Sequence, residues 1–184
     1  MEEKLKDLIQ KAQSGDRNAF GEIYQLYYKK IYRYCSFNVY DAAAAQDICQ
    51  ETFVKAWIKV KDFKMEKADW SFQAFLFAIA RNLIIDRSRA KKEYALEAYE
   101  ELESDEDHYE ALDKKADIER VRTAISKLEE VERQIVILRF FEEMDSKEVA
   151  NILKIKDGAL RVRQSRVLSK LKNIMEVLSS KQTN

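Results

Sequence analysis

The chain has 184 residues, of which 46% are hydrophobic, so it can form one domain or two small ones with a buried core in each. It contains no proline and only three glycines, and the alternation of apolar and polar residues that marks strands is hard to find, which predicts an all-α fold. Apolar runs stay below the roughly 18 residues of a membrane span, and the first residues do not resemble a signal peptide. We therefore expect a cytoplasmic protein without membrane insertion.

Residues that could ligate a metal or carry out catalysis are few and scattered. Cys35 and Cys49 have no second cysteine or histidine at ligand spacing and are expected to be core thiols. The single histidine, His108, lies among acidic residues but lacks a second pair of ligands. No set of nucleophile, base and orienting group stands out. The sequence predicts no metal, no cofactor, no small-molecule substrate and no enzymatic activity.

The net charge of zero hides a separation of charge along the chain. From Glu93 to Glu119 twelve acidic residues face only two lysines, so this segment carries minus ten and the remainder carries plus ten. The positive charge gathers in two places, between Arg81 and Lys92 and between Lys154 and Lys172. Such clusters predict that a polyanion binds at two separate places.

Two helices are predicted before residue 41. A short one ends at Ser14-Gly15, and Asp16 is placed to cap the next helix, which runs from about Arg17 to Tyr40. The second helix carries an aromatic and aliphatic stripe on one side. A stripe with this spacing is more typical of a core than of a binding surface.

The stretch from Ala45 to Val60 shows two stripes at the helical repeat, and Asp41 can cap its helix. One stripe is apolar and predicted to face the core. The other is acidic at its N-terminal end and apolar at its C-terminal end, where an ordinary surface helix would be polar throughout. This second stripe indicates a protein partner, or packing on a neighbouring helix of the same domain. It consists of Asp47, Glu51, Val54 and Ile58.

Helical periodicity stops between Lys61 and Ser71, in a predicted loop that bears two aromatic residues and several lysines. Aromatic rings beside cations are suited to stacking an unpaired base while the charge holds phosphate. The alternative is that Phe63 and Trp70 close the core under the loop. The next predicted helix, from Phe72 to Lys92, has a polar far side formed by Arg81, Ser88 and Lys92, with Asn82 and Arg89 nearby.

The acidic segment that follows is predicted to be a linker, because it has few positions with core-forming periodicity. Its negative charge would allow the segment to pass through a basic channel of a partner. The alternative is that the segment is only a solubilising tether. After it, the pattern predicts a second helical domain that contains a helix-turn-helix. Asp145 and Glu148 have the spacing of a capping box, Lys154 to Lys156 form the turn, and Asp157 can cap a long last helix.

Several motifs resemble conserved regions of bacterial sigma factors of the extracytoplasmic-function (ECF) type. Those of region two are Gly15-Asp16, Ala19-Phe20, Ile31-Tyr32-Arg33-Tyr34, Asp47 to Phe53, Lys55-Ala56-Trp57 and Ile79 to Asp86. The run from Glu148 to Arg163 resembles region four. The resemblance implies an all-α protein of two small domains, with residues 1–92 similar to region two, 93–117 as the acidic linker and 118–184 similar to region four.

The resemblance also implies partners and site residues. Core RNA polymerase is expected at Asp47, Gln50, Glu51, Val54 and Ile58. The minus-ten promoter element and its melted strand are expected at Phe63, Lys64, Trp70, Arg81, Asn82, Ser88, Arg89 and Lys92. The minus-thirty-five element is expected at Ser146, Lys147, Arg161, Arg163, Gln164, Ser165, Arg166 and Lys170. An anti-sigma factor is a further expected partner. The alternative is a helix-turn-helix regulator that needs no polymerase.

The chain departs from the family pattern at a few positions. Phe75 stands where tryptophan is common, and Glu129 stands where proline is common. Lys154 replaces a usual glycine at a turn that favours positive φ, so strain is expected there. The family commonly has hydroxyl side chains where this chain has Ala159 and Val162. Their loss leaves open which bases this protein recognises.

Overall fold

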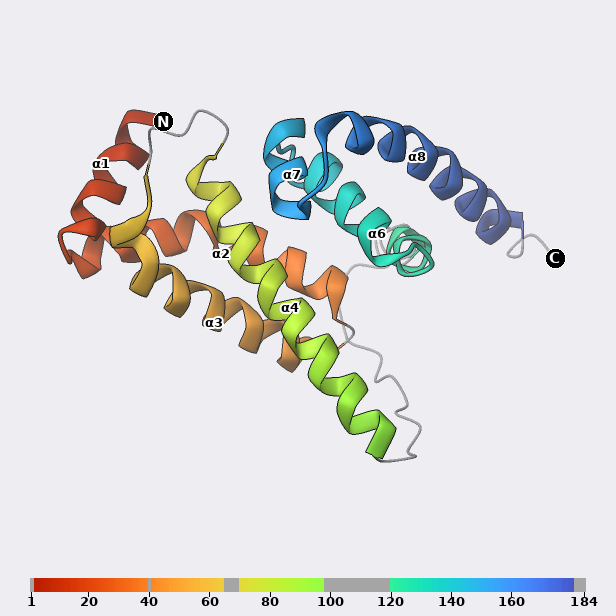
Figure 1. Ribbon diagram of the computed structural model, residues 1–184, viewed down its shortest axis with the longest axis horizontal. Coiled ribbons are helices and arrows are strands. Elements are labelled where there is room, and N and C mark those ends of the chain that lie inside the picture. The colour runs from red at the N-terminus through yellow and green to blue at the C-terminus, as the bar shows by residue number, and fades with distance from the viewer. Residues whose placement is uncertain (1, 40, 65–69, 98–119, 181–184) are drawn as a thin grey trace. The chain divides into compact units, whose positions relative to one another are not determined.

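The computed structural model describes residues 2–39, 41–64, 70–97 and 120–180, and the elements in these ranges are helices and turns (Figure 1). The chain divides into two compact units, Met1–Asp105 and Glu106–Asn184. This agrees with an all-α protein of two small domains. Most of the acidic linker and all of His108 lie outside the described residues. The predicted boundaries at residues 92 and 118 therefore stay predictions.

In its described residues, the first unit contains four helices and a short 3-10 turn. They are α1 (Glu2–Gln13), α2 (Arg17–Asn38), α3 (Ala42–Lys59), η1 (Val60–Asp62) and α4 (Phe72–Glu97). Both predicted caps are confirmed. Asp16 accepts hydrogen bonds from the backbone N–H groups of residues 18 and 19, and Asp41 accepts them from residues 43 and 44, which satisfies donors that a helix start leaves unpaired.

The core of the first unit lies where α2, α3 and α4 pack on one another, with α1 against α2. Tyr34 and Phe77 are fully buried and meet edge to face, with ring centroids 5.1 Å apart. Cys35 and Cys49 are fully buried free thiols, as expected. Burial raises the pKa of Cys49 to about 12, so this thiol stays protonated and unreactive.

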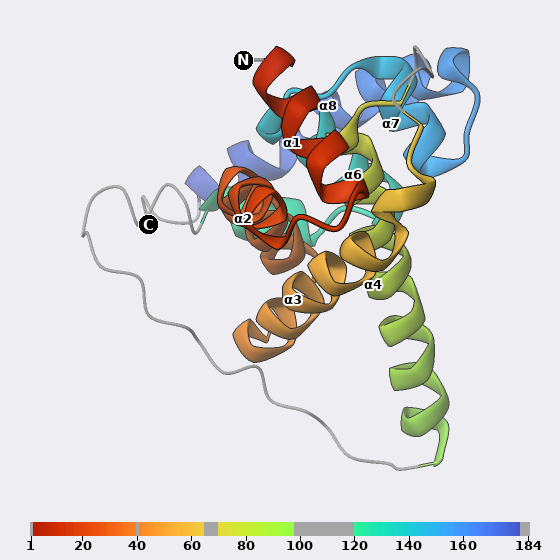
Figure 2. The same cartoon turned by 90° about the vertical axis from the view of Figure 1, so that its left-hand side faces the viewer.

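Helix α4 is longer than the sequence predicted. It ends at Glu97, whereas the predicted helix ended at Lys92. The added residues, Glu93 to Glu97, include alanine, leucine and glutamate, which all favour helix, and no glycine or proline stops it. Figure 2 shows its C-terminal half extending past the other helices of the first unit.

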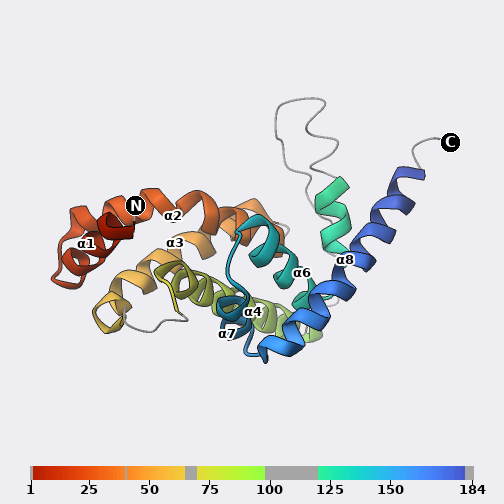
Figure 3. The ribbon, with the colours of Figure 1, turned by 90° about the horizontal axis from the view of Figure 1, so that it is seen from above.

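The second unit contains a helix at residues 120–126, α6 (Glu130–Val136), the π-helical turn η2 (Ile137–Phe141), α7 (Ser146–Leu153) and α8 (Asp157–Ser180). At the usual proline position, the Glu129 backbone N–H donates to the Glu132 carboxylate at 3.1 Å, which caps α6 in another way. Helices α7 and α8 form the predicted helix-turn-helix, and Figure 3 shows α8 leading away from α7.

The turn between α7 and α8 holds Lys154 in the left-handed region, with φ of 56° and ψ of 42°. A side chain with Cβ is strained there by roughly 1–2 kcal/mol, whereas glycine is not. We expect Lys154→Gly to raise the free energy of unfolding of the second unit by about 1 kcal/mol, after the greater freedom of glycine in the unfolded chain is subtracted. Urea unfolding followed by circular dichroism measures this change, and a loss of stability would contradict the strain.

Candidate partner-binding and nucleic-acid interfaces

The outer side of α3 presents the predicted second stripe to solvent. Val54 is 58% exposed and Ile58 is 67% exposed, so neither packs on a neighbouring helix. Of the two interpretations left open by the sequence, the structure thus favours a surface for a partner. The acidic end is exposed as well, and both acids have cationic neighbours: Asp47 lies 3.8 Å from Arg87 of α4, and Glu51 lies 2.9 Å from Lys55.

A hollow beside this stripe was not predicted from the sequence. It measures ≈ 360 Å³ and lies between α2 and α3, lined by Phe20, Tyr24, Gln50, Phe53, Val54 and Trp57. The α2 aromatics were assigned to the core, and Tyr24 does meet Phe53 edge to face at 4.7 Å. Phe20 and Tyr24 are nevertheless only half-buried. The signal in the sequence was their four-residue spacing, which matches that of Phe53 and Trp57.

Phe63 lies in the core instead of on the loop surface. Its side chain is 7% exposed, and its ring lies 5.1 Å from the rings of both Phe72 and Phe75. Gln13 also donates to the Phe63 carbonyl oxygen at 2.7 Å, which ties the loop entry to α1. The expectation that Phe63 stacks on a base is therefore wrong in this structure. Lys64 is exposed and Trp70 is half-buried, so Trp70 keeps an accessible surface.

The polar side of α4 carries the remaining residues that were assigned to the minus-ten element. Asn82, Ser88 and Arg89 are exposed, and Arg81 is half-buried. Ser88 follows Arg81 by two helical turns, so these two side chains lie on one side of the helix, with Asn82 and Arg89 on the adjacent side. Lys92 lies in α4, but its side chain is outside the described residues.

Most side chains assigned to the minus-thirty-five element are accessible on the helix-turn-helix. Lys147, Arg161, Arg163, Ser165 and Arg166 are exposed. Gln164 is half-buried, and its amide oxygen accepts a hydrogen bond from the Arg139 Nε at 3.4 Å. Gln164 is therefore turned toward η2, and Arg161 and Ser165 remain the accessible pair on the predicted reading side.

Asp157 does not cap α8, contrary to the prediction. The first helical hydrogen bond of α8 runs from the Leu160 N–H to the Lys156 carbonyl oxygen, so the cap position belongs to Lys156. The Asp157 carboxylate instead accepts the Ser146 hydroxyl at 2.6 Å and Arg161 Nη2 at 2.7 Å. The bond from Ser146 and the nearby charge of Arg161 lower the pKa of Asp157. Asp145 does cap α7, accepting the Lys147 N–H at 2.8 Å.

Lys170 was assigned to DNA phosphate, but it pairs with Glu132 of α6 at 2.6 Å. Desolvation raises the pKa of Glu132, but hydrogen bonds from Lys170 and the Glu129 N–H, together with the charge of Lys170, outweigh it and lower that pKa. The hydrogen bond to Glu132 raises the pKa of Lys170. The structure therefore gives Lys170 a role in joining α8 to α6.

This pair predicts a pH dependence. Because the pKa of Glu132 is lower in the folded state, the pair stabilises the folded unit at pH values above the ordinary pKa of 4.5. This contribution is lost as the pH falls through the pKa that Glu132 has in the folded state. Because the pKa of Lys170 is higher in the folded state, its contribution to stability is full below pH 10.5. That contribution is lost as the pH rises through the pKa that Lys170 has in the folded state. The difference in melting temperature between the wild type and Lys170→Gln should be constant near neutral pH and shrink on acidification. Melting curves from pH 3 to pH 8 test this, and parallel curves would exclude the contribution.

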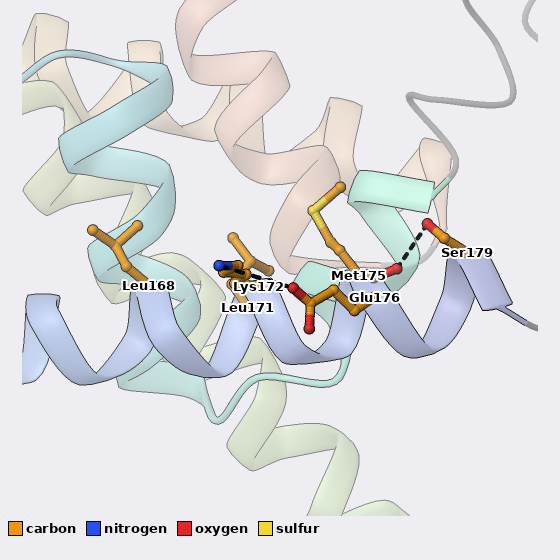
Figure 4. Close-up of a pocket in the computed structure, with 6 residues that line it drawn as sticks. All are labelled: Leu168, Leu171, Lys172, Met175, Glu176 and Ser179. Carbon is orange, nitrogen blue, oxygen red and sulfur yellow. Dashed lines mark hydrogen bonds and ion pairs between the residues drawn. The ribbon is translucent and has the colours of Figure 1, made fainter.

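The C-terminal half of α8 has a separate surface hollow of ≈ 530 Å³ (Figure 4). Among the described residues, those that line it come from α8, and Lys172 and Glu176 within it are 3.9 Å apart. In the part of the chain that the structure describes, no helix has the length and apolar character needed to cross a membrane.

Comparison with known proteins agrees with this geometry. The Sigma-70 region 2 family model matches residues 23–94, and the Sigma-70 region 4 model matches residues 118–171. The ECF RNA polymerase sigma factor SigW of Bacillus subtilis (strain 168) is 31% identical over 178 residues, covering 89% of this chain and 92% of SigW.

Two solved structures have the same fold. CnrH in complex with the cytosolic domain of CnrY is 23% identical, with a TM-score of 0.72 over 95% of this chain and 98% of that one. The sigma factor RpoE from Bartonella quintana, in complex with the anti-sigma factor NepR, is 22% identical, with a TM-score of 0.77 over 86% and 97%. The two family models and the similarity to SigW along most of both chains decide the assignment. The chain belongs to the ECF family of RNA polymerase sigma factors.

Proposed function

We propose that this sigma factor binds core RNA polymerase through the outer side of α3. The observation that carries the proposal is the combination of two exposed acids with two large, exposed apolar side chains on one side of a single helix. Such a surface fits a partner with basic residues beside an apolar patch. Gln50 lies at the edge of the neighbouring hollow and adds an amide to the same surface. The contact set is Asp47, Gln50, Glu51, Val54 and Ile58.

Promoter DNA is bound at two places in this proposal. In the first unit, Arg81, Asn82, Ser88 and Arg89 of α4 hold the melted minus-ten strand, with Lys64 on phosphate and Trp70 stacking on a base. Opening a duplex forfeits stacking of about 1.4 kcal/mol per step, so capturing unpaired bases keeps the strands apart. Lys92 belongs to this set by its spacing from Ser88 along α4.

The second unit holds the duplex at the minus-thirty-five element. The first turns of the second helix of a helix-turn-helix enter the major groove, which places Arg161 and Ser165 at base edges. Arg163 and Arg166 lie on the adjacent side and are assigned to phosphate, with Lys147 at the start of α7. Phosphate contacts add affinity without sequence information, whereas a bidentate arginine distinguishes guanine.

Run-off transcription with purified core polymerase on a library of genomic promoter fragments tests the proposal. The chain should direct transcription from a defined subset of fragments, and omission of the chain should abolish those transcripts. A helix-turn-helix regulator that needs no polymerase would retain duplex DNA by itself and yield no transcripts. The match to region 2 over residues 23–94 gives that alternative no support.

Three further properties belong to the same proposal. The chain has an anti-sigma partner, by analogy with the RpoE–NepR complex. It acts in the cytoplasm, where core polymerase and promoter DNA are found. It is not itself an enzyme, since the chemistry of transcription takes place in the polymerase.

A further inference from the structure

Three side chains form a chain of hydrogen bonds across the start of the helix-turn-helix. The Ser146 hydroxyl, in the first turn of α7, donates to Asp157 Oδ1 at 2.6 Å. Arg161 Nη2, one turn into α8, donates to Asp157 Oδ2 at 2.7 Å. Each carboxylate oxygen of Asp157 therefore accepts a hydrogen bond, Oδ1 from a side chain of α7 and Oδ2 from a side chain of α8.

Arg161 and Asp157 differ in exposure. The Arg161 side chain is 71% exposed, whereas that of Asp157 is 31% exposed. An exposed pair four residues apart on a helix usually contributes little, because both side chains are free to move. Here Ser146 holds the carboxylate from the opposite helix, so Asp157 has a defined position from which to orient Arg161.

We propose that Asp157 is a positioning residue that, held by Ser146, aims the guanidinium of Arg161 at a base edge of the upstream promoter element. This rests on the proposed function of the second unit. A guanidinium has five N–H donors in a planar fork, so one bond to Asp157 leaves donors for a bidentate contact with guanine. Fixing the side chain before binding removes part of the entropy cost of forming that contact.

The opposite effect of Asp157 on DNA binding also has a physical basis. A carboxylate near DNA repels phosphate, so an Asp157 without a positioning role would simply weaken binding to every sequence. Asp157→Asn keeps an oxygen that can accept the Ser146 hydroxyl but removes the negative charge. Positioning then predicts a loss of base preference, whereas simple repulsion predicts tighter binding to all sequences alike.

The test is selection of active promoters from a randomised upstream element, using holoenzyme made with wild-type protein, Asp157→Asn, Ser146→Ala, Arg161→Ala and the double variant Asp157→Asn/Arg161→Ala. Arg161→Ala should lower discrimination at one or two base positions roughly ten- to hundredfold. Asp157→Asn should lower it at the same positions by about two- to tenfold, with Ser146→Ala weaker in the same direction. The double variant should resemble Arg161→Ala alone, because the two residues act through one contact.

Glu176→Gln is the matched control. It removes an acid that faces a lysine four residues away on the same helix, and the selected element should not change. An unchanged element with Asp157→Asn overturns the proposal, and so does an equal loss at all promoters together with a lower melting temperature. If wild-type protein directs no transcription, the proposed function fails. Selection of duplexes bound by the full chain alone then judges the positioning role by the same pattern of positions.

Discussion

Replacing Asp47 and Glu51 by lysine is expected to weaken binding of core polymerase by at least about a hundredfold, while the melting temperature hardly changes. Like charges brought together across an interface cost several kcal/mol. The fold has little need of these acids, because they pair only at the surface, with Arg87 at 3.8 Å and with Lys55. Exposed pairs of this kind contribute about 0–1 kcal/mol each. Titration of fluorescently labelled protein with core polymerase measures the loss.

The chain offers a matched control for charge. Asp7 pairs with Lys11, and Glu22 pairs with Lys4, at exposures similar to those of the α3 acids. The double variant Asp7→Lys/Glu22→Lys therefore changes the net charge equally but on α1 and α2. It should bind core polymerase nearly as well as the wild type. Equal losses in both double variants would indicate a general charge effect and remove α3 as the binding surface.

Leu160→Ala is expected to unfold the second unit selectively. Leu160 is fully buried near the start of α8, and removing a buried leucine side chain costs about 2–5 kcal/mol. A unit of this size has only a few kcal/mol of stability to lose, because small domains bury less of their surface. Transcription from promoters that need the upstream element should therefore disappear. Affinity for core polymerase should persist, because α3 belongs to the first unit.

Calorimetry and the core polymerase titration together measure this result. The transition of the second unit should move to lower temperature, and that of the first unit should stay in place. Val177→Ala is the control, because it shortens an apolar side chain on the same helix that is 53% exposed. A parallel fall in core polymerase binding with Leu160→Ala would mean that the two units unfold together.

Local signals in the sequence were sufficient for most of the helices, for three of their caps and for the helix-turn-helix. Asp16, Asp41 and Asp145 each accept backbone N–H groups two or three residues ahead, so short-range spacing decides these helix starts. Lys154 lies at positive φ as its turn position predicted. The outer stripe of α3 was also visible in the sequence, because side chains three or four residues apart share a side of a helix.

Tertiary structure decided which distant residues meet. Phe63 was ambiguous because a loop aromatic can face solvent or core, and only the positions of Phe72 and Phe75 place it inside. Lys170 was assigned to phosphate from its place along α8, but Glu132 lies 38 residues away in sequence and reaches it across the packed helices. Asp157 was assigned to a cap by its residue type, yet Ser146 and Arg161 occupy its carboxylate. Periodicity determines which side of a helix faces inward, whereas the partners of a polar side chain depend on how the helices pack.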